Sequence, residues 1–372
     1  MNLESLLKAK LNERKENNLF RELKKPTGLV DFCSNDYLGL ARSEELYQRI
    51  LHRCQNENRK QNGATGSRLL SGNSILVEEV EHKLADVLAS EAALIFNSGY
   101  SANLAVFSSL PQRNDTILYD QLAHASIKDG ARLSLAKKFS FRHNDLNDLE
   151  SKLKRASGSI YVAVESVYSM DGDECPLNDL LFLTSRYGAF IILDEAHSTG
   201  VRGANGSGIA TSLPGFTGIA VRLYTFGKGM GVHGACVAGS KTLVEYMINF
   251  SRPFIYTTAL PPHSILAIDC AFEYLRENIH LQSKLAENVN TFLQGIGELP
   301  NRIMSNSAIQ TVIISGNKNV REAASNLQAQ GFDVRPIVSP TVPARSERLR
   351  ICIHVYNTPE EILKLTNELK KL

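Results

Sequence analysis

The sequence predicts an α/β protein, with a large domain built on a mainly parallel sheet covered by helices and a smaller α+β domain after it. Three observations predict this class. Short apolar runs recur between residues 75 and 250, most segments between them are long enough for a helix, and the pattern changes after Pro261 and Pro262. We therefore expect the chain to divide into an N-terminal helix and arm, a large domain and a small C-terminal domain, over residues 1–45, 46–260 and 261–372.

The first elements follow from residue spacing. Leu3, Leu6, Leu7 and Leu11 recur at helical spacing, which predicts an amphipathic helix over residues 3–23. A loop-rich segment follows, and then a helix over residues 75–88. Short apolar runs next predict strands, at residues 92–96, 116–119, 159–165, 190–194 and 220–226. The segments SANLAVFSSL and LNDLLFLTSRY between these runs have helical spacing.

The C-terminal third has a different pattern. Residues 263–297 predict one long helical stretch. Scattered strands follow near 309–315 and 348–353, and a final helix begins at Thr358. This order is typical of a smaller α+β domain.

Composition excludes several classes of partner. Lys and Arg total 41 against 39 Asp and Glu, so a net charge of +2 gives no reason to expect a nucleic acid or an anionic membrane, and a small molecule is the expected partner. The six cysteines lie far apart, which indicates buried thiols in a reducing compartment rather than disulfides or a zinc site. The sequence shows no signal peptide and no apolar run approaching roughly 18 residues, so we expect a cytoplasmic protein.

Lys228 is the residue on which the functional hypothesis centres. It lies among three glycines directly after an apolar strand, in TFGKGMG. Glycines let a ligand approach the backbone, and a partly desolvated lysine there becomes nucleophilic toward an aldehyde. Taken alone, the segment fits a surface turn equally well. Its glycines also match the dinucleotide spacing G-x-G-x-x-G, but that fingerprint must open a helix, whereas ACVAGS predicts a strand.

Asp194 and His197 form the second feature. Asp194 ends the apolar strand FIILD, and ligands of open α/β sheets bind at the carboxyl ends of the strands. An acid at that edge can hold the ring nitrogen of pyridoxal phosphate protonated, which makes the ring an electron sink. His197 follows three residues later and can reach the same place. The structural alternative is a helix cap and a core histidine.

A turn of small residues is the third feature. Ser98, Gly99 and Tyr100 join a strand to a helix, and a helix N-terminus suits a phosphate. An ordinary helix cap by Ser98 explains the same residues. His124 is uninformative by itself and by default is structural.

Three further side chains stay open on this reasoning. Ser169 follows a strand and can face the edge that carries Asp194, although DG at 171–172 is mainly a turn signal. The two aspartates of this segment lack a third ligand nearby, so no metal site is expected. Thr257 and Thr258 either donate to a phosphate or mark the domain boundary, and the boundary is favoured when they are taken alone.

In this order, these segments resemble the α-oxoamine synthase family of fold-type I pyridoxal-phosphate enzymes, over nearly the whole chain. The resemblance implies an aspartate aminotransferase-like fold and the cofactor pyridoxal 5'-phosphate. It is carried by NDYLGL, GSRLLSG, NSGYSAN, HASIKDG, SMDGD, DEAHSTG, TFGKGMG, YTTALPP and PTVP. YTTALPP, the HND after Arg142 and PTVP followed by RLRI look most like the 8-amino-7-oxononanoate synthases.

The resemblance implies roles at the cofactor. Lys228 would carry it as a Schiff base and later remove the α-proton of L-alanine. Asp194 would pair with the ring nitrogen, and His124 would stack on the ring face. Further contacts to the ring oxygen, to the body of the cofactor and to its phosphate would come from His197, Ser169, Ser98, Gly99, Tyr100 and Thr225.

The resemblance also implies partners. Thr257 and Thr258 would reach the phosphate of the partner subunit, so a homodimer with shared active sites is expected. The substrate-binding positions match Arg21 in the opening helix, His124, Thr341 and Arg350, where a guanidinium suits a carboxylate.

The implied reaction condenses L-alanine with a pimeloyl thioester, on coenzyme A or an acyl-carrier protein, and releases CO2 and 8-amino-7-oxononanoate for biotin synthesis. Arg345 and Ser346 stand where relatives carry a small residue and glycine, and CIHVYNT after RLRI is unusual; both place the acyl substrate in doubt. The alternatives are 2-amino-3-ketobutyrate ligase, 5-aminolevulinate synthase or serine palmitoyltransferase activity. A non-catalytic partner subunit is a different class, and Lys228 speaks against it.

Overall fold

The computed structural model describes residues 2–23, 25, 28–57 and 60–372. The chain forms two compact units. The central unit comprises Asn35–Ser169 and Glu174–Leu285, and the terminal unit comprises Met1–Ser34, Met170–Asp173 and Ala286–Leu372. The boundaries of these two units differ from those of the three domains expected at 1–45, 46–260 and 261–372, and that division into domains stays a prediction.

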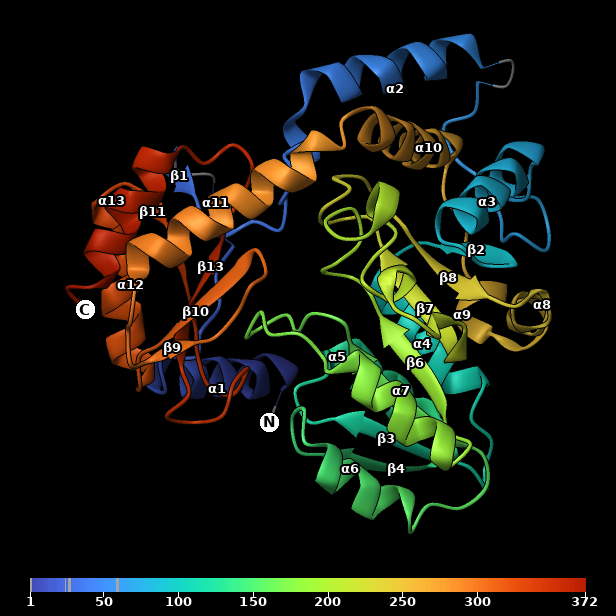
Figure 1. The fold of residues 1–372 in the computed structure, drawn as a ribbon, viewed down its shortest axis with the longest axis horizontal. Coiled ribbons are helices and arrows are strands. Elements are labelled where there is room, and N and C mark those ends of the chain that lie inside the picture. The colour runs from blue at the N-terminus through green and yellow to red at the C-terminus, as the bar shows by residue number, and fades with distance from the viewer. Residues whose placement is uncertain (1, 24, 26–27, 58–59) are drawn as a thin grey trace. The chain divides into compact units, whose positions relative to one another are not determined.

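A seven-stranded sheet lies at the centre of the central unit (Figure 1). Its strands are β2 Ala92–Phe96, β3 Thr116–Asp120, β4 Lys137–Phe141, β5 Ile160–Glu165, β6 Phe190–Asp194, β7 Ile219–Thr225 and β8 Ala235–Gly239. They are arranged in the order β2-β8-β7-β6-β5-β3-β4, and β8 alone runs antiparallel to its neighbours. The mainly parallel α/β class is confirmed, as are the five strands predicted from apolar runs and the strand in ACVAGS.

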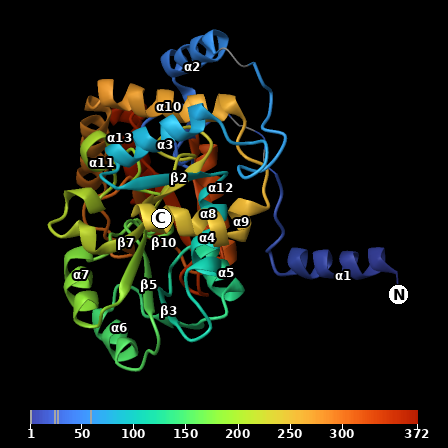
Figure 2. The same cartoon turned by 90° about the vertical axis from the view of Figure 1, so that its right-hand side faces the viewer.

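Helices cover both faces of this sheet. They are α2 Glu44–Asn56, α3 Ile75–Val87, α4 Gly99–Ser109, α5 Ala125–Leu133, α6 Leu146–Leu153, α7 Leu177–Arg186, α8 Lys241–Phe250, α9 Arg252–Ile255 and α10 Pro262–Glu277. One core joins the sheet to α4, α5, α8 and α9 through side chains such as Val106 and Ile127. The other joins it to α6 and α7 through Leu149 and Leu180. Figure 2 shows α6 and α7 on one side of β3 and β5, and α4 and α5 on the other.

Three features of the central region differ from expectation. Strand β4 was not predicted, because it is an edge strand with only Phe141 buried. Helix α2 lies in the segment expected to be loop-rich; Leu46 is its only buried residue. The predicted stretch 263–297 is two helices, since α10 ends at Glu277 and α11 runs from His280 to Ile296. Asn278 ends α10, and its side-chain amide donates to the Tyr274 carbonyl (3.0 Å).

The terminal unit holds two small sheets. Strands β1 Val30–Asp31 and β11 Phe332–Asp333 pair in parallel. A second, antiparallel sheet has the order β12-β13-β10-β9 and consists of β9 Arg302–Ile303, β10 Ile309–Ile313, β12 Arg335–Ile337 and β13 Arg348–Cys352. Its remaining helices are α1 Leu3–Glu16, α12 Asn317–Ala329 and α13 Pro359–Leu369. Thr358 caps α13 through a capping box with Glu361, which confirms the predicted start of the final helix.

The opening helix is shorter than predicted. It ends at Glu16, where the Asn17 side chain donates to the Glu13 carbonyl (2.8 Å) and Asn18 adopts a φ of 56°. The helix predicted over 3–23 is therefore correct at its start and wrong at its end. Arg21, expected within the helix, lies beyond it and is exposed.

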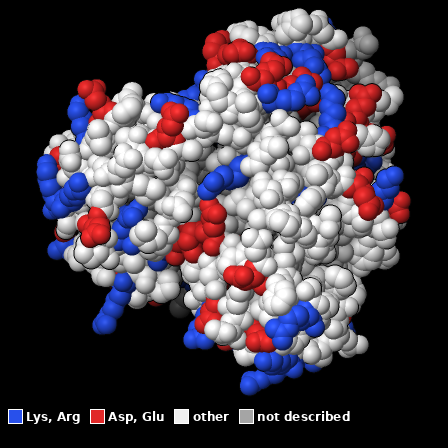
Figure 3. Space-filling view, viewed as in Figure 1, with Lys and Arg blue, Asp and Glu red and all other residues white. Residues whose placement is uncertain are grey.

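Charged side chains of both signs are mixed on the surface. On the face drawn in Figure 3 they gather most densely over α2 and α10. Ion pairs there join Arg49 to Glu277 (2.7 Å) and Arg53 to Asp269 (2.7 Å). Among the described residues, no helix combines the length and the apolar character needed to cross a membrane.

Candidate active site

The site is built at the carboxyl ends of strands β5, β6 and β7. Glu165 and Asp194 are register partners at the ends of neighbouring strands, and Asp194 also pairs with Leu223 of β7. Residues that follow these strand ends therefore meet at one edge of the sheet, as ligand-binding residues of open α/β sheets do.

Lys228 lies in the loop after β7 and is half-buried. Its Nζ lies 2.8 Å from His197 Nε2, and His197 Nδ1 lies 2.7 Å from the Tyr37 hydroxyl. Tyr37 in turn donates to Asn35 Oδ1 (3.0 Å). This pattern fits a neutral His197 that donates from Nδ1 and accepts at Nε2 from the lysine. Lys228 and His197, predicted from separate motifs, are therefore in direct contact.

Asp194 is held at the strand end by two donors. The Ala196 backbone N–H donates to Oδ1 (2.9 Å), and the Asn103 side-chain amide donates to Oδ2 (2.7 Å). Asp194 is 5% exposed. Hydrogen bonds from neutral donors stabilise a carboxylate that burial has removed from water. The alternative of a helix cap does not describe Asp194, because the described segment between β6 and β7 contains only short 3-10 turns and no α-helix.

His124 caps α5. Its backbone N–H donates to Glu165 Oε1 (2.6 Å), and its Nδ1 accepts from the Ser126 N–H (3.2 Å) while lying 2.7 Å from Ser126 Oγ. Burial lowers the pKa of His124, as does the positive charge of Lys228, while Asp194 opposes them. A neutral imidazole with a fixed ring orientation results.

The N-terminus of α4 lies against the end of β7. Ser98 caps the helix in a capping box with Ser101, as the structural alternative expects. Glycine at 99 permits this close approach, because a Cβ atom would overlap the Thr225 hydroxyl. The helix start and the Thr225 side chain thus form one small polar surface, which suits a phosphate.

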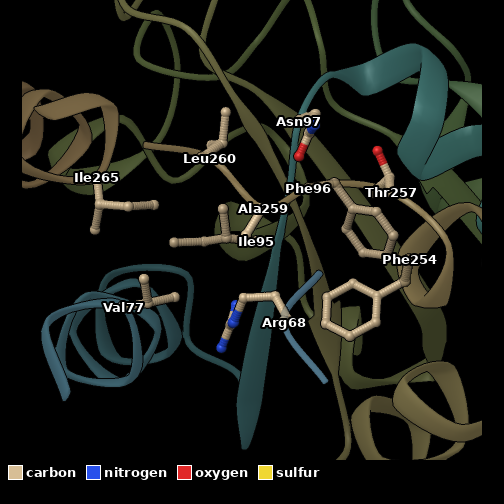
Figure 4. A pocket seen from close by; sticks show the side chains of 10 residues that line it. All are labelled: Arg68, Val77, Ile95, Phe96, Asn97, Phe254, Thr257, Ala259, Leu260 and Ile265. Atoms are coloured by element: carbon tan, nitrogen blue, oxygen red, sulfur yellow. The ribbon is translucent and has the colours of Figure 1, made fainter. Parts of the chain in front are cut away.

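Ser169, Thr257 and Thr258 are placed less directly. Ser169 is buried in a turn four residues after β5. The Thr258 carbonyl accepts from the Asn97 side chain (3.0 Å), just before α4. Thr257 lines a small pocket, and Figure 4 shows Asn97 and Thr257 on one side of it and Arg68 on the other.

The predicted substrate residues Arg21, Thr341 and Arg350 belong to the terminal unit. Thr341 lies exposed in a turn, and Arg350 is buried in β13, where its guanidinium donates to Cys352 Sγ (3.0 Å). Their assignment to the substrate stays a prediction.

Sequence reasoning missed three side chains of the site. Asn103 and Glu165 hold Asp194 and His124, and Tyr37 holds His197. A signal existed for Asn103, because it lies one helical turn after Gly99 and so on the same helix face. Tyr37 lies in the segment NDYLGL and Glu165 in the strand predicted over 159–165, and neither residue was given a role from the sequence.

Comparisons with known proteins agree with this geometry. The family model for aminotransferase class I and II matches residues 27–369. The chain is 39% identical to 8-amino-7-oxononanoate synthase of Emericella nidulans, over 91% of this chain and 87% of that protein. It is 38% identical to a Bacillus licheniformis protein provisionally given the same name, over 95% and 93% of the two chains.

Solved structures give the same fold. Serine palmitoyltransferase from S. paucimobilis with bound PLP–myriocin aldimine superposes with a TM-score of 0.88 at 26% identity, covering 100% of this chain and 98% of that one. 8-Amino-7-oxononanoate synthase from Francisella tularensis gives a TM-score of 0.77 at 28% identity, over 92% and 98%. The chain has the fold-type I architecture, and it belongs to the aminotransferase class I and II family as a pyridoxal 5'-phosphate-dependent acyltransferase of the α-oxoamine synthase group.

Proposed function

We propose that this enzyme condenses L-alanine with a pimeloyl thioester and releases CO2, the free thiol and 8-amino-7-oxononanoate, a step of biotin synthesis. The observation that carries the proposal is the 39% identity with the Emericella nidulans enzyme of that name over nine tenths of the chain. The pimeloyl group is carried either by coenzyme A or by an acyl-carrier protein.

The residues present fit the cofactor. The cofactor needs an amine for its aldehyde, an acid for its ring nitrogen and donors for its phosphate. Lys228, Asp194 and the polar surface formed by Gly99 and Thr225 supply these groups at one sheet edge. When bound, pyridoxal phosphate supplies an electron sink that stabilises negative charge at the carbon next to the amine.

We assign a task to each residue of the candidate site. Asp194 holds a proton on the ring nitrogen, His124 stacks on the ring face, and His197 and Ser169 orient the ring oxygen. Ser98, Gly99, Tyr100 and Thr225 hold the phosphate end. Lys228 Nζ takes the α-proton of alanine and later returns a proton to the same carbon, and His197, at 2.8 Å, orients that amine.

The atoms of the reaction balance without an oxidant. The α-carbon of alanine forms a bond to the acyl carbon, the carbon–sulfur bond of the thioester breaks, and the thiol leaves with a proton. Loss of the alanine carboxyl as CO2 is followed by protonation of the same carbon. We propose that Arg21, Thr341 and Arg350 bind the carboxylates of the substrates.

We further propose a homodimer, in which Thr257 and Thr258 contribute to the cofactor site of the partner subunit. Thr257 is half-buried and Thr258 is exposed. A cytoplasmic location stays a prediction.

The test is a screen of the cofactor-loaded enzyme against alanine, glycine and serine, each with pimeloyl, succinyl, acetyl and palmitoyl thioesters. Thiol release and the product mass are measured. Alanine with a pimeloyl thioester should be turned over fastest.

A second candidate is favoured by the structural likeness to a Sphingomonas wittichii serine palmitoyltransferase, with a TM-score of 0.90 at 25% identity. Turnover of serine with palmitoyl thioester, but not of alanine, would establish that activity instead.

A further inference from the structure

Asn103 occupies a central position in the site that the proposed mechanism does not use. It lies on α4, is 2% exposed, and divides its two amide hydrogens between Asp194 Oδ2 (2.7 Å) and Ser126 Oγ (3.0 Å). Its Oδ1 has no hydrogen-bond partner among the described residues. The reverse orientation of the amide would set its oxygen against a carboxylate oxygen. Asn103 therefore acts here as a double donor.

The second hydrogen of Asn103 leads to His124. Ser126 Oγ accepts from Asn103, so its own proton is free to be donated to His124 Nδ1 at 2.7 Å. The Ser126 backbone N–H also donates to Nδ1 (3.2 Å). With Nδ1 accepting twice, the proton of a neutral His124 resides on Nε2. One amide thus connects the carboxylate assigned to the ring nitrogen with the imidazole assigned to the ring face.

We propose that Asn103 is a positioning residue that keeps Asp194 ionised and His124 in its Nε2–H tautomer, and so sets the protonation of the bound cofactor. This inference rests on the proposed roles of Asp194 and His124. A hydrogen bond donated to a buried carboxylate favours its ionised form, and an ionised Asp194 keeps the ring nitrogen protonated.

Other charged groups surround this pair. Glu165 lies beside Asp194 at the end of β5, and Asp120 ends β3. Lys128 lies on α5, the helix that His124 caps, and Lys228 and His197 follow β7 and β6. None of these groups is substituted in the Asn103 variants, so a difference between variants reports on the amide.

The decisive variant is Asn103→Asp, which keeps the shape and replaces the donor by a carboxyl group. Two carboxyl groups at this distance share a proton at low pH. The protonated variant can still donate to Asp194, whereas the ionised variant cannot. We expect near wild-type behaviour at acid pH and loss of that behaviour as the pH rises. Asn103→Ser, which is small and lacks the reach, should be defective at every pH.

The readouts use the cofactor alone. Apoprotein is titrated with pyridoxal phosphate from pH 5.5 to 9, and affinity and the pH midpoint of the visible band are recorded. Asn103→Ser should bind at least about tenfold more weakly, as expected for loss of a hydrogen bond to a charged group, and should shift the midpoint by about one unit. Asn103→Asp should bind the cofactor more weakly only above the pH at which the introduced carboxyl group ionises.

Two controls separate positioning from stability. Asn288 is a buried asparagine of the terminal unit whose amide donates to the carbonyls of His354 (2.8 Å) and Asn357 (2.9 Å). Asn288→Asp should lower the unfolding midpoint without moving the cofactor band. Ser126→Ala keeps the bond from Asn103 to Asp194 and removes the hydroxyl contact to His124 Nδ1, while the backbone N–H donor to Nδ1 stays. It should therefore weaken cofactor binding without the midpoint shift.

The inference is overturned if the Asn103 variants bind the cofactor as the wild type does with an unshifted band, or if Ser126→Ala shifts the midpoint as they do. Should Asn103→Ser fail to fold, Asn103→Asp, which keeps the shape of the side chain, decides alone. Because neither alanine nor a thioester is added, a failure of the proposed reaction leaves these measurements intact. A wild-type chain that turns over alanine while its Asn103 variants keep the normal band would refute this inference alone.

Discussion

Replacing Glu165 by glutamine should change how the stability of the apoprotein depends on pH. Glu165 ends β5, is 2% exposed and accepts the His124 backbone N–H (2.6 Å). Burial raises the pKa of Glu165 to about 8, with a further increase from the negative charge of Asp194. Glutamine keeps an acceptor oxygen at the same place and cannot titrate. The substitution therefore isolates the proton of Glu165.

The size of the effect follows from the shift. Between pH 4.5, the ordinary value, and about 8, the folded chain keeps a proton on Glu165 that the unfolded chain has lost. The free energy of unfolding then falls as the pH rises, by up to about 1.4 kcal/mol per pH unit. This stability is fully present below pH 4.5 and is lost as the pH passes through the folded value. From pH 4.5 to about 8, the free energy of unfolding falls by about 5 kcal/mol in total.

The assay is urea unfolding of the apoprotein at pH 5, 6, 7 and 8. Relative to the wild type, Glu165→Gln should gain about 1 kcal/mol per pH unit across this range. Glu79→Gln changes an exposed glutamate of α3 in the same unit and should run parallel to the wild type. If the curves for Glu165→Gln and the wild type are also parallel, Glu165 is ionised throughout and the reasoning fails.

Three further substitutions test the contacts of the site. Lys228→Arg keeps a cation but cannot form the covalent link, so borohydride should no longer fix the cofactor to the chain, as mass spectrometry would show; a label found on another residue would contradict the assignment. Gly99→Ala forces a Cβ onto the Thr225 hydroxyl, and cofactor affinity measured by titration should fall at least about tenfold; unchanged affinity would disprove the phosphate site. Tyr37→Phe removes the 2.7 Å bond to His197 Nδ1. It should lower kcat about tenfold and change the stability by only about 1 kcal/mol, and an unchanged kcat would remove Tyr37 from the mechanism.

Matched controls exist for each of these. Lys128→Arg changes a lysine of the same unit that donates to the Gln121 carbonyl (2.7 Å). Gly63→Ala adds a Cβ with no atom within 4 Å. Tyr47→Phe alters a tyrosine that is 60% exposed. All three should leave cofactor binding and kcat unchanged.

Buried apolar runs made the central sheet predictable. Strands β5, β6 and β7 carry consecutive buried residues, so their sequences show them without any knowledge of their neighbours. Edge strand β4 lacks that signal, because four of its five positions are exposed and two are lysines. Helix α2 is equally weak in sequence, since Tyr47 is exposed and Leu51 is 39% exposed.

The candidate site was predictable to the extent that its residues follow strands. Asp194 and Lys228 stand at strand ends, and parallel strands bring those ends together. Asn103 could not be found in the same way, because its partner Asp194 lies 91 positions along the chain. Likewise, Tyr37 meets His197 across 160 positions. Side-chain partners at such separations depend on the folded arrangement.

Two neighbouring carboxyl groups at this edge of the sheet, Asp194 and Glu165, have different surroundings. They are register partners, so their charges repel each other when both are ionised. Among the described residues, Asp194 accepts two hydrogen bonds, from the Asn103 side chain and the Ala196 N–H, whereas a single N–H, that of His124, reaches Glu165. Burial and the negative charge of Asp194 raise the pKa of Glu165 to about 8, so Glu165 keeps its proton at neutral pH. Changes at Glu165 should therefore appear in the pH dependence of stability, and changes at Asn103 in the protonation of the cofactor.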